Sequence, residues 1–264
     1  MEATPIRAIL FDLGDTLLDF KPLNIGKIVE AGAADSYQKI AEMGYRLPSL
    51  GAYRRRHMMA VRFALVTTHL MRREFNILKL MRRRTARLGV PDTDEIMLDL
   101  GWRWYRPTVA YSSIESDLIA TLRTLREAGF KLGVVSNTFM GGVLLDRHMD
   151  EMGILEFFPM RIYSSEFGVR KPDPRIFQEA LKQIDEPAES TLFVGDIIKN
   201  DIIGPRKLGM KTAWKVRSKT AGTHRNAPPP PKVVPADYTI KRIADLLPIL
   251  MPRQIEEPVA ASVG

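Results

Sequence analysis

The sequence of 264 residues contains no cysteine. Disulfide bonds and thiolate metal sites are therefore excluded. Long apolar runs are also missing: no stretch of about 18 apolar residues is present, so the sequence predicts neither a membrane span nor a membrane partner. The amino terminus lacks the layout of a secretion signal, because its apolar stretch Ile6–Leu13 is short and acidic residues follow at once. These absences predict a cytoplasmic protein.

Positive charge is unevenly distributed along the chain, whose formal net charge is +8. Residues 20–107 contain 17 Lys and Arg but 8 Asp and Glu, and the rest of the chain contains 22 and 23. A surface formed by this basic segment would attract anionic ligands. Arginine runs such as Arg54–Arg56 and Arg82–Arg84 are more often solvated helix faces. Nucleic acid is therefore a less favoured partner of this segment.

The basic segment has the pattern of a helical unit. Residues 24–44 and 50–88 carry apolar side chains at helix-like spacing, with basic residues between them. Pro48 and Pro91 interrupt the pattern. About four helices are therefore predicted between residues 20 and 109, followed by a return linker through Arg106-Pro107-Thr108.

Outside this unit the chain alternates between strand and helix patterns. Strands are predicted at 7–11, 131–135, 160–163, 191–194, 211–216 and 236–240, and helices at 116–128, 143–152, 174–183 and 198–208. Such alternation predicts an α/β fold, a Rossmann-like parallel sheet with helices on both faces. Residues 1–19 and 110–252 would form this core and 20–109 a smaller α-helical domain. An extended loop is predicted at 227–231 and a frayed tail at 253–264.

Four short motifs stand out, and three of them follow predicted strands. They are Phe11-Asp12-Leu13-Gly14-Asp15-Thr16, Val134-Val135-Ser136-Asn137, Arg170-Lys171-Pro172-Asp173-Pro174, and Val194-Gly195-Asp196 continuing to Asn200-Asp201. In open α/β sheets, ligands bind at the carboxyl ends of the strands. The motifs would therefore bring carboxylates, a hydroxyl and a lysine into one crevice, a set of groups suited to phosphate chemistry.

In this order, the four motifs resemble the signature motifs of the haloacid dehalogenase-like hydrolase superfamily. The resemblance covers roughly residues 5–19 and 110–250, and the helical unit resembles the family's inserted cap only in layout. Most members are magnesium-dependent phosphatases that work through an aspartyl-phosphate. The resemblance therefore implies a Mg²⁺-dependent hydrolase that acts on a small phosphorylated metabolite.

The resemblance also implies roles for the acidic residues. Asp12 corresponds to the nucleophile, whose attack on phosphorus divides one difficult displacement into two easier steps. Asp196 and Asp201 correspond to metal ligands, together with Asp12 and the backbone carbonyl of Gly14. Hard oxygen ligands beside a phosphate suit Mg²⁺. Each of these aspartates could instead be an ordinary turn or helix-capping residue.

Three further residues correspond to groups that contact the phosphoryl group. Lys171 resembles the lysine that bridges the nucleophile and the phosphate, and its charge would offset the mutual repulsion of the carboxylates. Ser136 resembles the hydroxyl that donates a hydrogen bond to a phosphoryl oxygen, with the backbone N–H of Asn137 beside it. Taken alone, Ser-Asn after a strand also fits a simple turn.

One position departs from the family pattern. The family's phosphatases usually carry a second aspartate, a general acid and base, two residues after the nucleophile, where this chain has Gly14. Asp15 is one position late and would point the opposite way in extended backbone. It replaces the missing acid only if the loop bends, which Gly14 could allow. General acid–base catalysis is typically worth about 10²–10⁴-fold in rate, so the chain either recruits Asp15 or hydrolyses phosphate monoesters slowly.

Two other functions remain open from the sequence. One is a weakly active or inactive member of the superfamily whose basic helical unit binds an acidic protein or nucleic acid. The other, less favoured, is a haloacid dehalogenase, because those enzymes also lack the second aspartate but do without Asp196 and Asp201. The sequence leaves the natural substrate and the oligomeric state open.

Overall fold

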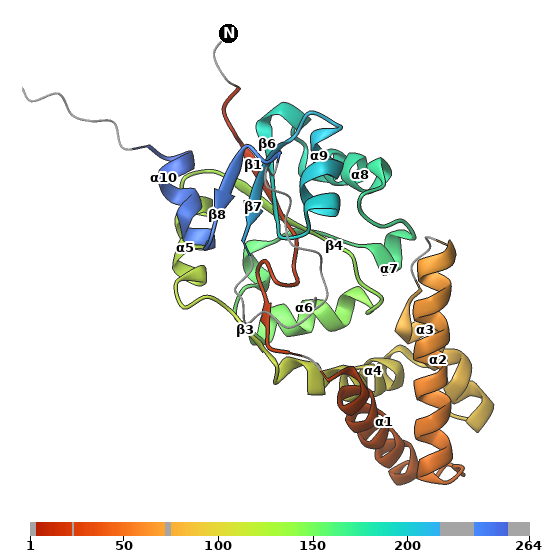
Figure 1. Cartoon of the computed structure of the whole chain (residues 1–264). Coiled ribbons are helices and arrows are strands. Elements are labelled where there is room, and N and C mark those ends of the chain that lie inside the picture. Colours follow the sequence, from red (N-terminus) through yellow and green to blue (C-terminus); the bar gives the residue numbers. More distant parts are fainter. Residues whose placement is uncertain (1–3, 23, 72–74, 217–234, 253–264) are drawn as a thin grey trace, which may run out of the picture.

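The computed structural model describes residues 4–22, 24–71, 75–216 and 235–252, apart from the side chains of 64–65 and 67–71. A six-stranded sheet forms its centre, with the strands in the order β5-β4-β1-β6-β7-β8 and all neighbours parallel (Figure 1). The strands are β1 (Ala8–Phe11), β4 (Lys131–Ser136), β5 (Met160–Tyr163), β6 (Thr191–Gly195), β7 (Lys211–Lys215) and β8 (Tyr238–Ile240). The predicted α/β fold is confirmed.

Helices cover both faces of this sheet. They are α5 (Leu118–Glu127), α6 (Gly142–Glu151), α7 (Ser164–Phe167), α8 (Pro174–Ile184), α9 (Gly204–Arg206) and α10 (Leu246–Leu250), with single turns η2 (Leu155–Phe157), η3 (Ala188–Ser190) and η5 (Ile243–Asp245). A π-helical segment, η4 (Ile198–Ile203), precedes α9. The central strands β1 and β6 are buried along their whole length, as expected of parallel strands that are covered on both faces.

Alternate residues of β1 show how the two layers are divided. Ala8 and Leu10 pack with the apolar face of α8, whereas Ile9 and Phe11 belong to the larger core that includes α5 and α6. Phe11 meets Phe158 edge-on, with ring centroids 5.8 Å apart. All four residues of β1 are fully buried, which places this strand at the centre of the molecule.

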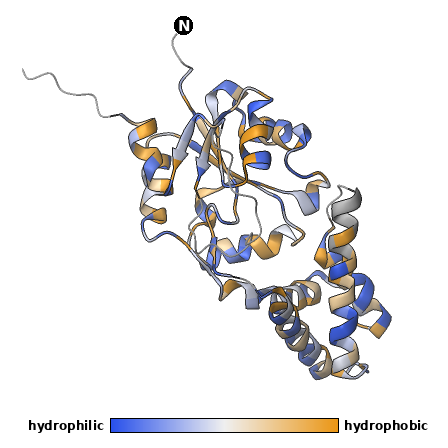
Figure 2. Ribbon diagram, viewed as in Figure 1, coloured by the Kyte–Doolittle hydropathy of each residue, from blue (hydrophilic) through white to orange (hydrophobic). Residues whose placement is uncertain are grey.

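Four helices, together called the helical insert (residues 25–109), lie between two short crossing strands. They are α1 (Ile25–Glu42), α2 (Leu50–Met71), α3 (Ile77–Thr85, followed by the turn η1, Ala86–Leu88) and α4 (Asp94–Val109). The crossing strands β2 (Asp19–Phe20) and β3 (Ser112–Ser113) pair antiparallel. The insert lies to one side of the sheet in Figure 1, and hydrophilic residues recur along its helices in Figure 2.

Local signals set the bounds of the insert helices. The side chain of Asn24 accepts a hydrogen bond from the Lys27 N–H at the start of α1, and Thr93 does the same for the Ile96 N–H at the start of α4. Helices α1 and α4 approach closely at Gly32, where a Cβ atom would lie 2.3 Å from the carbonyl oxygen of Trp104. Glycine is therefore required at this crossing.

A buried histidine joins the insert to the sheet layer. His148 of α6 contacts the hydroxyl of Tyr105 through Nδ1 at 2.8 Å and that of Ser112 through Nε2 at 2.7 Å. The Ser112 hydroxyl donates to the carbonyl of Val109, so it accepts from His148 Nε2–H, and Tyr105 donates to Nδ1. Burial lowers the pKa of His148 to about 4, which keeps the ring neutral near pH 7.

Two predicted elements differ in the structure. The return linker predicted at Arg106-Pro107-Thr108 is wrong, because Pro107 lies inside α4; the buried packing of Trp104 and Tyr105 one turn earlier outweighs the helix-breaking tendency of proline. The helix predicted at 198–208 is divided into η4 and α9, since Pro205 favours a new helix start. Residues 227–231 and 253–264 lie outside the described residues.

Within the described ranges, none of the helices combines the length and apolar character that crossing a membrane requires.

A buried lysine at the end of β7 ties together the two chain crossings. The Lys215 ammonium lies 2.8 Å from a Glu115 carboxylate oxygen, 3.3 Å from an Asp19 oxygen and 2.6 Å from the Thr16 carbonyl. Asp19 leads into the insert and Glu115 follows the return strand β3. Lys215 is 4% exposed, so these partners must offset the cost of burying its charge.

Replacing Lys215 by methionine should lower the free energy of unfolding by about 3 kcal/mol, because Glu115 would keep a largely buried charge without its cation. Urea denaturation measures the loss. Lys211→Met in the same strand is the matched control: the Lys211 side chain is 45% exposed and lies 3.5 Å from Asp237, so its loss should cost less than about 1 kcal/mol. Equal losses in the two variants would contradict the assigned role of Lys215.

Candidate active site

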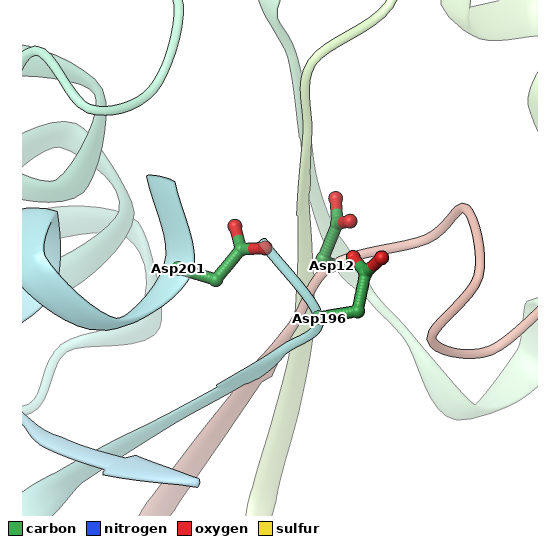
Figure 3. Close-up of side chains that lie close together, drawn as sticks. All are labelled: Asp12, Asp196 and Asp201. Atoms are coloured by element: carbon green, nitrogen blue, oxygen red, sulfur yellow. The ribbon is translucent and has the colours of Figure 1, made fainter. Parts of the chain in front are cut away.

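Three carboxylates converge at the carboxyl edge of the sheet. Asp12 directly follows β1, Asp196 directly follows β6, and Asp201 lies in η4. Each offers one oxygen atom, and these atoms all lie within 4.8 Å of one another. Figure 3 shows the three side chains turned toward a common point. β1 and β6 are neighbours in the sheet, so residues distant in the chain meet here.

The local backbone permits this convergence. A Cβ atom on Gly195 would lie 2.4 Å from the Cβ of Asp201, so only glycine allows Asp201 to approach the end of β6. The N–H of Ile197 donates to Asp201 Oδ2 at 2.8 Å and fixes the direction of that carboxylate. Asp201 belongs to a π-helical segment, a rare conformation that is frequent at functional sites.

Lys171 lies between two of these carboxylates. Its Nζ is 2.7 Å from Asp12 Oδ1 and 2.8 Å from Asp201 Oδ1, and it lies 5.0 Å from the centroid of the Phe193 ring. Burial alone would lower the pKa of Lys171, but the charges of Asp12 and Asp201 outweigh burial and raise it. The lysine is therefore an ammonium in this site.

The side chain of Asn137 holds the backbone of Lys171 in place. Its Oδ1 accepts from the Lys171 N–H at 2.7 Å and its Nδ2 donates to the Lys171 carbonyl at 2.9 Å. Sequence reasoning considered the Asn137 backbone and missed this side-chain role, for which the sequence offers no signal across a separation of 34 residues. Ser136, the buried last residue of β4, lines a cavity that opens beside the carboxylate cluster.

The charges of the cluster fit a divalent cation. Three carboxylates and one ammonium leave two negative charges when all are ionised. Burial is the largest cause that raises the pKa of Asp201 to about 6; Lys171 partly lowers it and Asp12 raises it. A cation of charge +2 would remove this excess, and a set of oxygen donors suits a hard ion. Asp12, Asp196 and Asp201 could therefore hold such an ion.

The loop after Asp12 bends at Asp15, whose φ angle is 55°. Asp15 lines the cavity, its N–H donates to the Leu18 carbonyl at 2.7 Å, and its Oδ1 accepts from the Phe20 N–H at 3.3 Å. Gly14 has an ordinary backbone conformation, and a Cβ atom there would meet nothing closer than Phe20 at 3.8 Å. The missing side chain at position 14 is therefore no requirement of the fold.

A cavity of about 530 Å³ opens beside the cluster. Asn200, the neighbour of Asp201 in η4, also lines it. The insert contributes apolar and aromatic residues to its wall: Ile25, Ile28, Val29, Val61, Trp104 and Tyr105. From the sheet side come Leu18, Phe20, Phe139, Met140 and Leu145. Trp104 and Tyr105 are both buried. Their place in the cavity wall follows only from how α4 sits against α1 and α6.

Comparison with known proteins decides the family. The family model described as haloacid dehalogenase-like hydrolase matches residues 6–209. This chain belongs to that family. The resemblance predicted from the four motifs is thereby confirmed, and the protein is a hydrolase of this kind.

Similar proteins include several phosphatases. The chain is 28% identical to a glyceraldehyde 3-phosphate phosphatase of Methanopyrus kandleri over 93% of this chain and 97% of that protein. It is 24% identical to a ribulose-1,5-bisphosphate 5-phosphatase of Halopiger xanaduensis, over 90% and 97%. Both alignments run through the helical insert as well as the sheet.

Solved structures with the same fold include a HAD phosphatase of Thermococcus onnurineus and a 2-haloacid dehalogenase of Pseudomonas syringae. The first superposes with a TM-score of 0.54 at 20% identity, covering 93% of this chain and 98% of that one. The second gives a TM-score of 0.57 at 22% identity with the same coverages. These structures share the fold of this chain.

Mg²⁺ should raise the melting temperature of the protein, because an ion that binds only the folded state stabilises it by about 2.7 kcal/mol at 100 times its Kd. Differential scanning fluorimetry over a Mg²⁺ series measures the rise. Asp196→Asn should remove most of it, and Asp150→Asn, at an exposed position of α6, should keep it. An equal rise in both variants would show that the ion binds elsewhere.

Proposed function

We propose that this chain is a Mg²⁺-dependent phosphatase that acts on a small phosphorylated metabolite through a phosphorylated Asp12. The contact that carries the proposal is the 2.7 Å pair between Lys171 Nζ and Asp12 Oδ1, beside Asp196 and Asp201. The names of the archaeal relatives support phosphate ester hydrolysis. Mg²⁺, when bound by Asp12, Asp196, Asp201 and the Gly14 carbonyl, would neutralise charge on the transferring phosphoryl group.

The residues of the chain would then divide the reaction between them. A carboxylate oxygen of Asp12 forms a bond to phosphorus while the ester P–O bond breaks, and water later hydrolyses the acyl-phosphate to regenerate Asp12 and release phosphate. The Lys171 ammonium offsets the negative charge on the phosphoryl oxygens, and Ser136 with the Asn137 N–H donates hydrogen bonds to them. The helical insert would act as a cap that excludes water.

Departure of the leaving group is the step for which this chain offers the least catalytic assistance. The carboxylate of Asp15 accepts the Phe20 N–H and closes its own turn, as expected of a turn-capping residue. With glycine at position 14, we propose that the leaving oxygen departs without a protein acid, or with weak help from Asp15. The enzyme would therefore be slow on esters of weakly acidic alcohols.

Aryl phosphates should be hydrolysed in a Mg²⁺-dependent reaction that Asp12→Asn abolishes, since an amide cannot attack phosphorus. Phosphate release from phenyl phosphate and from ethyl phosphate measures both the activity and the leaving-group effect, and phenyl phosphate should be the far better substrate. Asp15→Asn serves as the control for recruitment of that side chain. Rapid, equal turnover of both esters, unaffected by Asp15→Asn, would contradict the proposed leaving-group step.

Introducing the missing acid should accelerate the reaction. Gly14→Asp is sterically allowed, and kcat/KM for ethyl phosphate should rise by about tenfold or more, toward the 10²–10⁴-fold that general acid–base catalysis typically gives. Gly14→Asn has the same shape without a transferable proton and should give no gain. The idea fails if both variants, folded by circular dichroism, change the rate equally.

The rival proposals have less support. A haloacid dehalogenase would have no use for the Asp196 and Asp201 carboxylates. A pure binding protein would have no use for the Lys171–Asp12 pair. Salt-sensitive binding to polyanions without any phosphate release would favour that second reading.

A further inference from the structure

The cavity beside the carboxylate cluster has an unusual distribution of charge. Among the described residues that line it, the charged ones are Asp12, Asp15, Lys171 and Asp201. Asp12, Lys171 and Asp201 contact one another within the cluster, and Asp15 accepts the Phe20 N–H. The described remainder of the wall carries no charge, so no cation there is placed to pair with a second anionic group of a substrate.

None of the described lysines and arginines of the insert lines this wall. Arg54 pairs with Glu30 at 2.8 Å, and both Arg103 and Arg106 pair with Asp35, at 3.0 and 2.9 Å. None of these arginines lines the cavity. The positive charges of these three arginines are therefore engaged in ion pairs on the helix surfaces. The attraction of anions predicted from the sequence would act only outside the cavity.

Most of the described wall is instead apolar and partly aromatic, although the uncharged polar residues Thr108, Thr138 and Asn200 also line it. Phe20, Trp104, Tyr105 and Phe139 contribute rings, and Phe139 is fixed by stacking on Phe75 at a centroid distance of 5.2 Å. The hydroxyl of Tyr105 donates a hydrogen bond to His148 Nδ1, so its proton is not directed at a substrate in the cavity. At about 530 Å³, the cavity falls within the roughly 300–1,000 Å³ typical of small-molecule sites.

We propose that the leaving group of the substrate is apolar and carries no charge, so that the phosphate is the only anionic group of the substrate. The proposal rests on the proposed phosphatase function and narrows its substrate class. An apolar group gains by leaving water for this wall. A carboxylate or second phosphate would lose its hydration without a cation to replace it. This proposed substrate class differs from the small, polar sugar phosphates that appear in the names of the relatives.

Three aryl phosphates separate charge from size: 4-methylphenyl, 4-butylphenyl and 4-(3-carboxypropyl)phenyl phosphate. Their methylene groups insulate the ring, so the three phenols leave with similar ease. In the wild-type protein with Mg²⁺, kcat/KM should rise from methyl to butyl by about fourfold for each added methylene that is buried. The carboxylated compound should be at least about 100-fold worse than the butyl compound.

A cation placed at the cavity should reduce this discrimination. Ile25 lines the cavity yet is 51% exposed, so Ile25→Lys should fold. It should raise kcat/KM for the carboxylated compound by about fivefold, the upper range for a partly exposed ion pair. Ile25→Gln is the matched control, polar but uncharged, and should give no such gain. Melting temperatures of both variants report whether they remain folded.

Binding gives a second readout that does not need turnover. In calorimetry with the wild-type protein and Mg²⁺, 4-butylbenzylphosphonate should bind with a more negative heat-capacity change than benzylphosphonate, the mark of buried apolar surface.

If the three phosphates are hydrolysed but the carboxylated one equals the butyl one, the phosphatase stands and the apolar substrate class is wrong. If no phosphate is hydrolysed and the heat-capacity difference is present, the cavity is apolar as proposed and the phosphatase function is wrong. Equal heat-capacity changes for the two phosphonates would overturn the apolar class.

Discussion

The contact of the Lys171 ammonium with Asp12 and Asp201 is the constraint on which this site depends. Three carboxylates with oxygens within 4.8 Å of one another repel each other strongly in a buried place. Lys171 offsets one of the three charges, and Asn137 holds the lysine backbone by two hydrogen bonds. Because a charge of −2 remains when all four groups are ionised, the site suits a divalent cation.

The fold serves this contact by bringing strand ends together. β1 lies between β4 and β6, so Asp12, Ser136 and Asp196 emerge at one edge although they are far apart in the chain. This edge is where open parallel sheets bind ligands. The helical insert leaves the core through β2, shortly after Asp12, and returns through β3, which pairs with β2. Lys215 ties both crossings to β7. The position of the insert over the site therefore depends on a buried ion pair.

Two features bear on which substrates the proposed phosphatase would hydrolyse. Gly14 leaves no acid where the family's phosphatases have one, and Asp15 serves the turn that it forms. The described cavity wall is mostly apolar, while Arg54, Arg103 and Arg106 of the insert pair with carboxylates and do not line it. Under the proposed function, these features would favour leaving groups that are apolar and that depart readily, a narrower class than phosphorylated metabolites in general.

The sequence by itself determined the sheet, most helix positions and the family, because buried strands and catalytic loops depend on local patterns of apolar, small and acidic residues. The strand predicted around residues 160–163 is β5, Met160–Tyr163. The sequence could not show that Pro107 stays within α4 or that the Asn137 side chain hydrogen-bonds the Lys171 backbone. Nor could it show that none of the described basic residues of the insert lines the cavity. These outcomes depend on contacts between residues far apart in the chain, where packing outweighs local preference. Only the tertiary structure decided what faces the substrate.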